Sequence, residues 1–108
     1  MLYNIGMDTT ALIAHARARF DHATSRRIMK EKYQARMIFA YAGGMFQAGP
    51  ELLTLLHACP VEGDIVILDL YENPVKVNAL ELQHIAQDRW QEQMNAWLVE
   101  YEQQSKQR

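Results

Sequence analysis

Two histidines and the single cysteine are the residues of this chain best suited to a metal site or to nucleophilic catalysis. His57 and Cys59 are separated by one residue, and His84 follows much later. A zinc site uses three or four ligands, usually with recognisable paired spacing. One His-x-Cys pair with a remote third ligand lacks that spacing, and Cys59 has no local signature of a catalytic nucleophile. We therefore predict no metal site, no cofactor and no catalytic residue.

The acidic residues after position 50 are spread along the chain, and Asp69 is unusual because it lies within the apolar run 64–70. A carboxylate directed into a core must be paired or protonated. If the strand is half exposed, its alternation places Asp69 in water instead, and we favour this second interpretation. Gly43, Gly44 and Gly49 lack the spacing and the lysine of a phosphate-binding loop. We therefore do not expect an enzyme.

The elements that would position these groups are mainly helical. Residues 8–48 are expected to form mainly one long helix, capped by Asp8 or Thr9, because apolar residues recur at helical spacing and no Gly or Pro interrupts the pattern before Gly43. Two helices that meet near position 24 are the alternative. The adjacent Gly43 and Gly44 would cost about 2 kcal/mol inside a helix. They indicate either a helix end or a place where another backbone comes very close.

One short helix and one β-hairpin are predicted in the middle of the chain. Pro50 suits the first position of a helix that continues over 51–57, because the N–H that proline lacks has no helical partner there. Pro60 would end that helix. Two apolar runs, at 64–70 and 75–77, predict antiparallel strands, and the Tyr-Glu-Asn-Pro sequence between them is a turn signal. Such a hairpin is marginal alone, so it must pack on helices or add strands from another chain.

The last predicted element is a long helix that begins after Asn78 and reaches about Gln103. Asn78 and Glu81 have the spacing of a capping box, and residues 104–108 are expected to fray. We predict one mostly α domain of the α+β class, with two long helices and a short helix packed with one β-hairpin. The long helices would pack antiparallel, or residues 1–24 would form a projecting helical arm. The residues expected to allow close packing are Ala40, Ala42, Gly43 and Gly44.

Charge is distributed unevenly along the chain. Residues 1–36 contain seven Lys/Arg and three Asp/Glu, a net of +4, whereas residues 37–108 contain four and ten, a net of −6. A basic segment attracts a polyanion, an acidic partner or the acidic end of a neighbouring copy. A face of the helix that is merely solvated explains the same residues, and we favour that interpretation for the segment as a whole. The candidate contact residues are Arg19, Arg26, Arg27, Lys30 and Lys32.

Large apolar side chains recur at three- and four-residue steps on one face of the last helix, at Trp90, Met94 and Trp97. Aromatic residues are frequent anchors of protein interfaces, so these three are the candidate interface residues. The same residues serve equally well in a core, and we favour that interpretation. A small-molecule site on this face would additionally require a pocket.

The longest apolar run, residues 37–46, is well short of the roughly 20 residues that span a bilayer. Residues 1–7 lack the pattern of a signal peptide, and a single cysteine cannot form an intramolecular disulfide. These features predict a soluble protein that is located in a reducing cytoplasm and does not bind membranes.

Several short motifs lie within residues 41–101. They are Ala48-Gly-Pro-Glu-Leu-Leu53, Cys59-Pro60, Ile65-Val-Ile-Leu-Asp-Leu-Tyr-Glu-Asn-Pro-Val-Lys-Val-Asn78, and the helical Asp88-Arg-Trp90, Asn95-Ala-Trp97 and Glu100-Tyr101. In these motifs the chain resembles small uncharacterised proteins of T4-like tailed phages, particularly those of marine cyanophages. The resemblance implies an accessory or virion-associated protein in an infected bacterium. It carries no motif of known chemistry and transfers no site.

Three functional hypotheses follow. The first is a non-enzymatic phage accessory, assembly or structural protein that acts through helix-mediated oligomer or partner contacts, with a homodimer as the first expectation. It would be located in the cytoplasm of the infected host or in the virion. The alternative is a small regulator that binds nucleic acid or host RNA polymerase through the basic N-terminal helix. A small-molecule binder that uses Trp90 and Trp97 ranks last.

Overall fold

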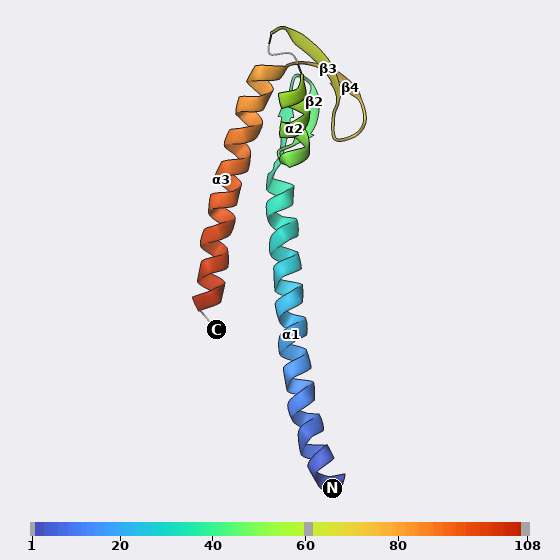
Figure 1. The fold of residues 1–108 in the computed structure, drawn as a ribbon, viewed down its shortest axis with the longest axis vertical. Helices are drawn as coiled ribbons and strands as arrows, with labels where there is room; N and C mark the ends of the chain where they lie inside the picture. Colours follow the sequence, from blue (N-terminus) through green and yellow to red (C-terminus); the bar gives the residue numbers. More distant parts are fainter. Residues whose placement is uncertain (1, 60–61, 107–108) are drawn as a thin grey trace. The chain divides into compact units, whose positions relative to one another are not determined.

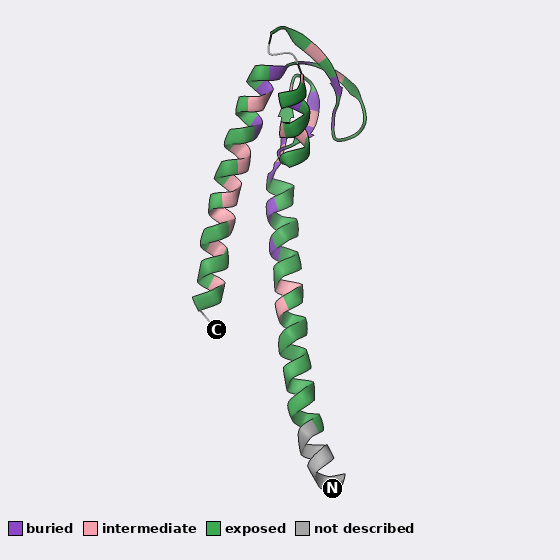
Figure 2. Ribbon diagram, viewed as in Figure 1, coloured by how far each residue is buried: buried purple, intermediate pink, exposed green. Residues whose placement is uncertain are grey.

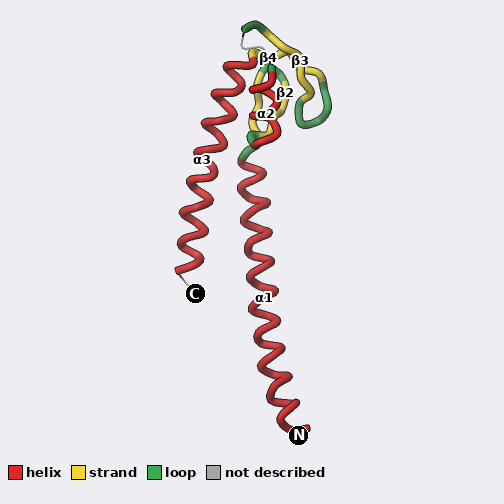
Figure 3. Tube along the Cα trace, in the orientation of Figure 1, coloured by secondary structure: helices red, strands yellow, loops and turns green. Residues whose placement is uncertain are grey.

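The structure is a computed structural model that describes residues 2–59 and 62–106. It confirms a mostly α protein of the α+β class (Figures 1 and 3), although it contains two β-hairpins where one was expected. The chain divides into two compact units, residues 1–32 and residues 33–108. In chain order the elements are α1 (Leu2–Arg36), β1 (Ile38–Tyr41), β2 (Gly44–Gln47), α2 (Pro50–Ala58), β3 (Asp64–Leu68), β4 (Pro74–Asn78) and α3 (Ala79–Lys106).

The first helix differs from the prediction at both ends. It begins at Leu2, so Asp8 and Thr9 lie inside it and do not cap its start. It is continuous through position 24, which excludes two helices that meet there. It ends at Arg36 instead of near position 48. Beyond it, β-branched and aromatic residues favour an extended chain.

The tract that was expected to continue the helix forms the first hairpin. β1 pairs antiparallel with β2, with Tyr41 opposite Gly44, so Ala42 and Gly43 form a two-residue turn. Their φ angles are both positive, 51° and 84°, and a tight turn of this kind matches the twist of the paired strands. The predicted close packing of two long helices through Ala40, Ala42, Gly43 and Gly44 is therefore wrong.

Gly44 lies where the second hairpin approaches the first. A Cβ atom at this position would lie 2.8 Å from Cγ2 of Val75 and 3.3 Å from Cβ of Asp69. A close approach by another segment therefore explains this glycine, although the nearest atoms belong to side chains and not to a backbone. Its neighbour Gly43 is explained by its positive φ instead.

Replacing Gly43 with alanine is expected to destabilise the protein by about 1–2 kcal/mol, the cost of placing a Cβ in the left-handed region. Apart from the two chain neighbours, no heavy atom of the described residues lies within 4 Å of such a Cβ, so backbone strain is the whole effect. Urea denaturation measures the change in the free energy of unfolding. Ala42→Gly is the matched control and should be neutral or slightly stabilising, because it removes a Cβ from the same region. Equal stability of Gly43→Ala and the parent protein would contradict this turn.

The second hairpin and the short helix agree with their predictions. β3 pairs antiparallel with β4, with Asp64 opposite Asn78, and α2 begins at Pro50. Pro60, which was expected to end α2, lies outside the described residues. The side-chain oxygen of Asn78 accepts a hydrogen bond of 2.9 Å from the backbone N–H of Glu81, as expected for the start of α3. α3 continues past position 103 to Lys106, and residues 107 and 108 lie outside the described part.

The core of residues 33–108 lies where the two hairpins meet α2 and the first turns of α3 (Figure 2). Phe46 is 2% exposed, and its ring lies 6.3 Å from the ring of Phe39 and 6.4 Å from that of Tyr41, measured between centroids. Leu82, on the buried face of α3, is 0% exposed. The buried cluster comprises Met37, Phe39, Phe46, Ala48, Leu56, Ile67, Val77, Ala79, Leu82 and Ala86.

Candidate functional site

An apolar groove of about 800 Å³ lies on residues 33–108. We call it the tryptophan groove, because it contains both tryptophans of the chain. Side chains from α2, from the end of β3 and the turn that follows it, and from α3 line it, with Met37 and Phe46 of the core also contributing. Its large apolar lining residues outside the core are Leu52, Leu55, Leu68, Leu70, Trp90 and Trp97.

Local sequence explains how α2 faces the groove. The helix begins at Pro50, so Leu52 and Leu55 fall three residues apart and lie on the same helix face. Gly49, just before the helix, lies beside α3, and a Cβ there would lie 3.9 Å from Cζ3 of Trp90. Leu55 remains 45% exposed, so this wall of the groove presents apolar surface to solvent.

Trp97 is held in place by the last turn of α1. Its ring stacks on the ring of Tyr33, with centroids 5.6 Å apart and an interplanar angle of 6°. The Tyr33 hydroxyl donates a hydrogen bond of 3.3 Å to the carbonyl of Ala96, and the guanidinium of Arg36 lies 5.2 Å from the centroid of the Tyr33 ring. These contacts orient Trp97 before anything binds in the groove.

The three candidate interface residues on α3 contact the core, the tryptophan groove, or both. Trp90, Met94 and Trp97 are all half-buried. Trp90 and Met94 pack against the buried core, while Trp90 and Trp97 also line the tryptophan groove. Core packing and a surface contact are therefore both compatible with their positions, and the pocket that a binding role requires is present.

Asp69 also lines the groove, and its position corrects the expectation that it faces water. It is 9% exposed. Its Oδ1 accepts hydrogen bonds from the backbone N–H groups of Asn73 (2.9 Å) and Tyr71 (3.0 Å), and its Oδ2 accepts one from Met45 (3.1 Å). The bonds from Asn73 and Met45, with a smaller contribution from Tyr71, hold the pKa of Asp69 below its ordinary value of 3.8, against the effect of burial.

The expectation that Asp69 faces water is wrong for a structural reason. β3 ends at Leu68, and Asp69 is the first residue of the turn. The less exposed residues of β3 are Ile65 and Ile67, so continued alternation places Asp69 on the inner side, and the expectation assigned it to the wrong side. An aspartate at the start of a turn characteristically accepts bonds from backbone N–H groups of that turn. That preference, together with the Asn-Pro sequence that follows, was a signal for its true role.

Asp69 and its neighbour join the two hairpins beside the groove. The N–H of Met45 donates to the Asp69 carboxylate, and its carbonyl accepts a bond of 2.7 Å from the N–H of Leu70. This pair of bonds fixes Leu70, a groove residue, against the strand that carries Phe46. The rim of the groove is thus set by hydrogen bonds as well as by packing.

The lining of the tryptophan groove carries acidic charge, and the guanidinium of Arg36 lies close by over Tyr33. Its two charged lining residues, Glu51 and Asp69, are both acidic, and residues 33–108 contain five basic and ten acidic residues, a net of −5. The groove therefore offers apolar contact to a group that carries, or is flanked by, positive charge.

The candidate basic residues of α1 are all exposed, but they do not form one patch. At 3.6 residues per turn, Arg19, Arg26 and Lys30 fall within an arc of about 40°. Arg27 lies about 60° from the edge of that arc, and Lys32 lies on the opposite side of the helix. Three of the five can therefore contact one surface together.

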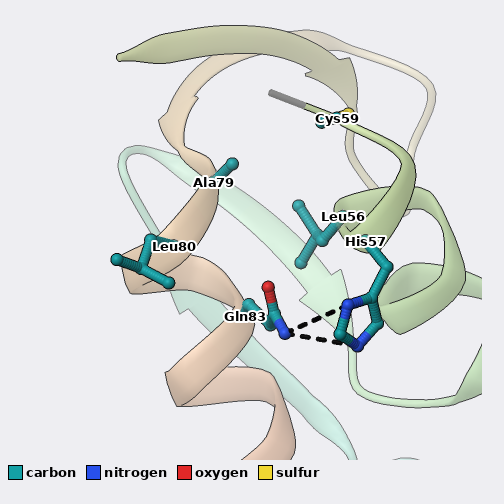
Figure 4. A pocket seen from close by; sticks show the side chains of 6 residues that line it. All are labelled: Leu56, His57, Cys59, Ala79, Leu80 and Gln83. Carbon is teal, nitrogen blue, oxygen red and sulfur yellow. Dashed lines mark hydrogen bonds between the residues drawn. The ribbon is translucent and has the colours of Figure 1, made fainter. Parts of the chain in front are cut away.

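His57 and Cys59 line a smaller pocket of about 260 Å³ (Figure 4). The His57 ring lies beside the amide of Gln83, whose Nε2 is 3.2 Å from Nε2 and 3.4 Å from Nδ1 of the ring. His84 is not among the lining residues of this pocket. Across residues 2–59 and 62–106, no three His, Cys, Asp or Glu side chains are grouped closely enough to hold a metal ion.

Within the described part of the chain, no helix is both long enough and apolar enough to cross a membrane.

The tryptophan groove and the basic face of α1 are the two candidate contact surfaces. Comparisons with protein-family models, with curated proteins and with solved structures find no match to this chain.

Proposed function

We propose that this protein is a non-enzymatic phage accessory, assembly or structural protein that works by contacts between copies of itself, with a homodimer as the basic unit. The observation that carries the proposal is the large apolar surface that its elements leave exposed. Leu12 and Phe20 on α1 are 65% and 70% exposed, Val66 and Leu68 on β3 are 66% and 61% exposed, and Leu98 and Val99 on α3 are each 55% exposed.

Val66 and Leu68 lie on the same side of β3, and Leu98 and Val99 are consecutive on α3, whereas most protein surfaces carry apolar residues singly. Contiguous apolar surface of this kind is removed from water when subunits associate, and its burial is the main driving force for association. The motifs in residues 41–101 that resemble those of tailed-phage proteins support the assignment to a phage assembly or to its infected host.

The proposal is tested by measuring the mass in solution by light scattering after size exclusion, at low and at high salt, with the 260/280 nm absorbance ratio recorded. We expect a discrete oligomer that resists salt and carries no nucleic acid. A monomer at every concentration, or a species that carries nucleic acid until salt removes it, would overturn the proposal.

A regulator that binds nucleic acid or host RNA polymerase is the second candidate, and the exposed face formed by Arg19, Arg26 and Lys30 favours it. The triple charge reversal Arg26→Glu, Arg27→Glu and Lys30→Glu separates the two functions. Loss of the oligomer without any effect on nucleic acid supports assembly. Loss of polyanion binding that had a steep salt dependence, with the oligomer intact, supports the regulator. Lys76→Glu, which reverses an exposed charge on β4, is the control.

A further inference from the structure

Helix α1 presents an apolar stripe along residues 12–23, within the N-terminal unit of the chain. At 3.6 residues per turn, its members fall within an arc of about 100°, the width typical of a helix face that packs against another surface. Ile13 is 51% exposed, and Leu12 and Phe20 are more exposed still. The N-terminal stripe comprises Leu12, Ile13, Ala16, Phe20 and Ala23.

Positive charge borders the N-terminal stripe. Arg19 and Arg26 lie along one edge of the arc, and Arg27 follows Ala23 at an angle within it. Residues 1–32 contain six basic and three acidic residues, a net of +3. The stripe is therefore an apolar surface in a basic setting, whereas the tryptophan groove is an apolar surface in an acidic setting.

We propose that the tryptophan groove of one copy binds the N-terminal stripe of a second copy. The inference rests on the proposed self-association and names the two surfaces that carry it. Phe20 and its neighbours lie against Trp90, Trp97 and Leu55 of the second copy, with the arginines facing its acidic surroundings. Reciprocal exchange gives two identical contacts and a closed dimer with twofold symmetry.

The geometry of the groove suits this role. Trp90 and Trp97 are aromatic anchors of the type that dominates binding energy in interfaces, and the stack on Tyr33 orients Trp97 in advance. Complementary charge steers the two surfaces together and disfavours pairing of one stripe with another, since like charges would then face each other. The groove should therefore bind the basic helix α1 of a second copy in preference to the acidic helices α2 and α3 of that copy.

The test uses two full-length variants, each of which makes one surface polar. Leu55→Gln alters the groove and Phe20→Gln alters the stripe. Both side chains are exposed at 45% and 70%, so each variant should retain the far-ultraviolet circular dichroism of the parent protein. We expect each variant to weaken the dimer at least tenfold, measured by sedimentation equilibrium across a range of concentrations.

The control variants are matched in residue type and exposure. Leu80→Gln alters a leucine that is also 45% exposed but lines the smaller pocket, not the groove. Ile28→Gln alters an apolar residue of α1 that is 56% exposed and lies about 60° outside the stripe. Both should leave the dissociation constant within about twofold of the parent value.

Mixing the two weakened variants gives the decisive result. In a mixed dimer, the intact stripe of Leu55→Gln meets the intact groove of Phe20→Gln, so one good contact forms where each variant alone has none. Its other contact carries both substitutions, and two changes that face each other in one contact cost less than their sum. The mixture should therefore dimerise more tightly than the mean of the two variants. Both tryptophans lie in the groove, so the emission maximum of the parent protein should also shift to shorter wavelength as its concentration rises.

Four outcomes would overturn the inference. If the dimer persists unchanged in both variants, the contact lies elsewhere, and the proposed self-association survives without this interface. If only Leu55→Gln weakens the dimer, another segment occupies the groove. If tryptophan emission does not depend on concentration while the mass does, no second copy enters the groove. A parent protein that is always monomeric would reject both the inference and the proposed function.

Discussion

Replacing Asp69 with asparagine is expected to lower the midpoint of thermal unfolding by roughly 10 °C or more. The carboxylate accepts three backbone hydrogen bonds, and bonds to a charged acceptor are stronger than neutral ones. An asparagine oxygen can still accept the two bonds within the turn, but its NH₂ group then faces the N–H of Met45, and two donors cannot bond. The link between the two hairpins is lost. Differential scanning calorimetry measures the shift.

Asp64→Asn is the control for this variant. Asp64 is exposed, and its Oδ2 lies 4.0 Å from Nζ of the exposed Lys76, so the change should move the midpoint by no more than a degree or two. An equal shift in the two variants would show that the bonds of Asp69 contribute no more than a surface carboxylate.

The stability of the parent protein should also depend on pH through Asp69. Because the pKa of this carboxyl is lower in the folded chain than its ordinary value of 3.8, the unfolded chain takes up the proton first as the pH falls. The contribution of Asp69 is therefore complete above that value and is lost as the pH falls below it, through the folded pKa. The difference in stability between the parent protein and Asp69→Asn should shrink over that range. A constant difference would contradict this role.

Local signals were sufficient for much of the second half of the fold. The proline at the start of α2, the capping Asn78 and the two apolar runs around a turn each act over a few residues, and the structure has all of them. The first half was harder because Ile38, Phe39 and Tyr41 fit a helix by spacing and a strand by type. Pairing with β2 decides between the two, and alanine is an uncommon residue at the turn position that Ala42 occupies.

The candidate site depends on contacts between segments that are far apart in the sequence. Trp90 and Trp97 were recognised as interface candidates, but the groove needs Leu52 and Leu70 as well, and nothing local to those residues marks them. Leu70 is placed by the bonds that Met45 makes to the turn after β3, and Leu52 reaches the groove only because α2 packs beside it. The charge contrast, by comparison, is a property of composition and needed no structure to be recognised.

Phe46→Ala is expected to be among the most destabilising single truncations in residues 33–108, at about 3–5 kcal/mol. Phe46 is 2% exposed, and the rings of Phe39 and Tyr41 pack against it. Their strand cannot move inward to fill the space, because it is paired with β2 along its whole length. The loss would be a large share of the 5–15 kcal/mol that usually separates folded and unfolded proteins. Urea denaturation followed by circular dichroism measures it.

Phe20→Ala is the matched control, since it removes the same side chain from a position that is 70% exposed. At concentrations where the protein is monomeric, it should change stability by no more than about 0.5 kcal/mol. The two phenylalanines then separate folding from assembly: loss of Phe46 weakens the chain at every concentration, and loss of Phe20 weakens only the associated form. If Phe46→Ala destabilised the chain as little as Phe20→Ala, the first hairpin would not form part of the core. Phe46 would then not be the buried residue that lines the tryptophan groove.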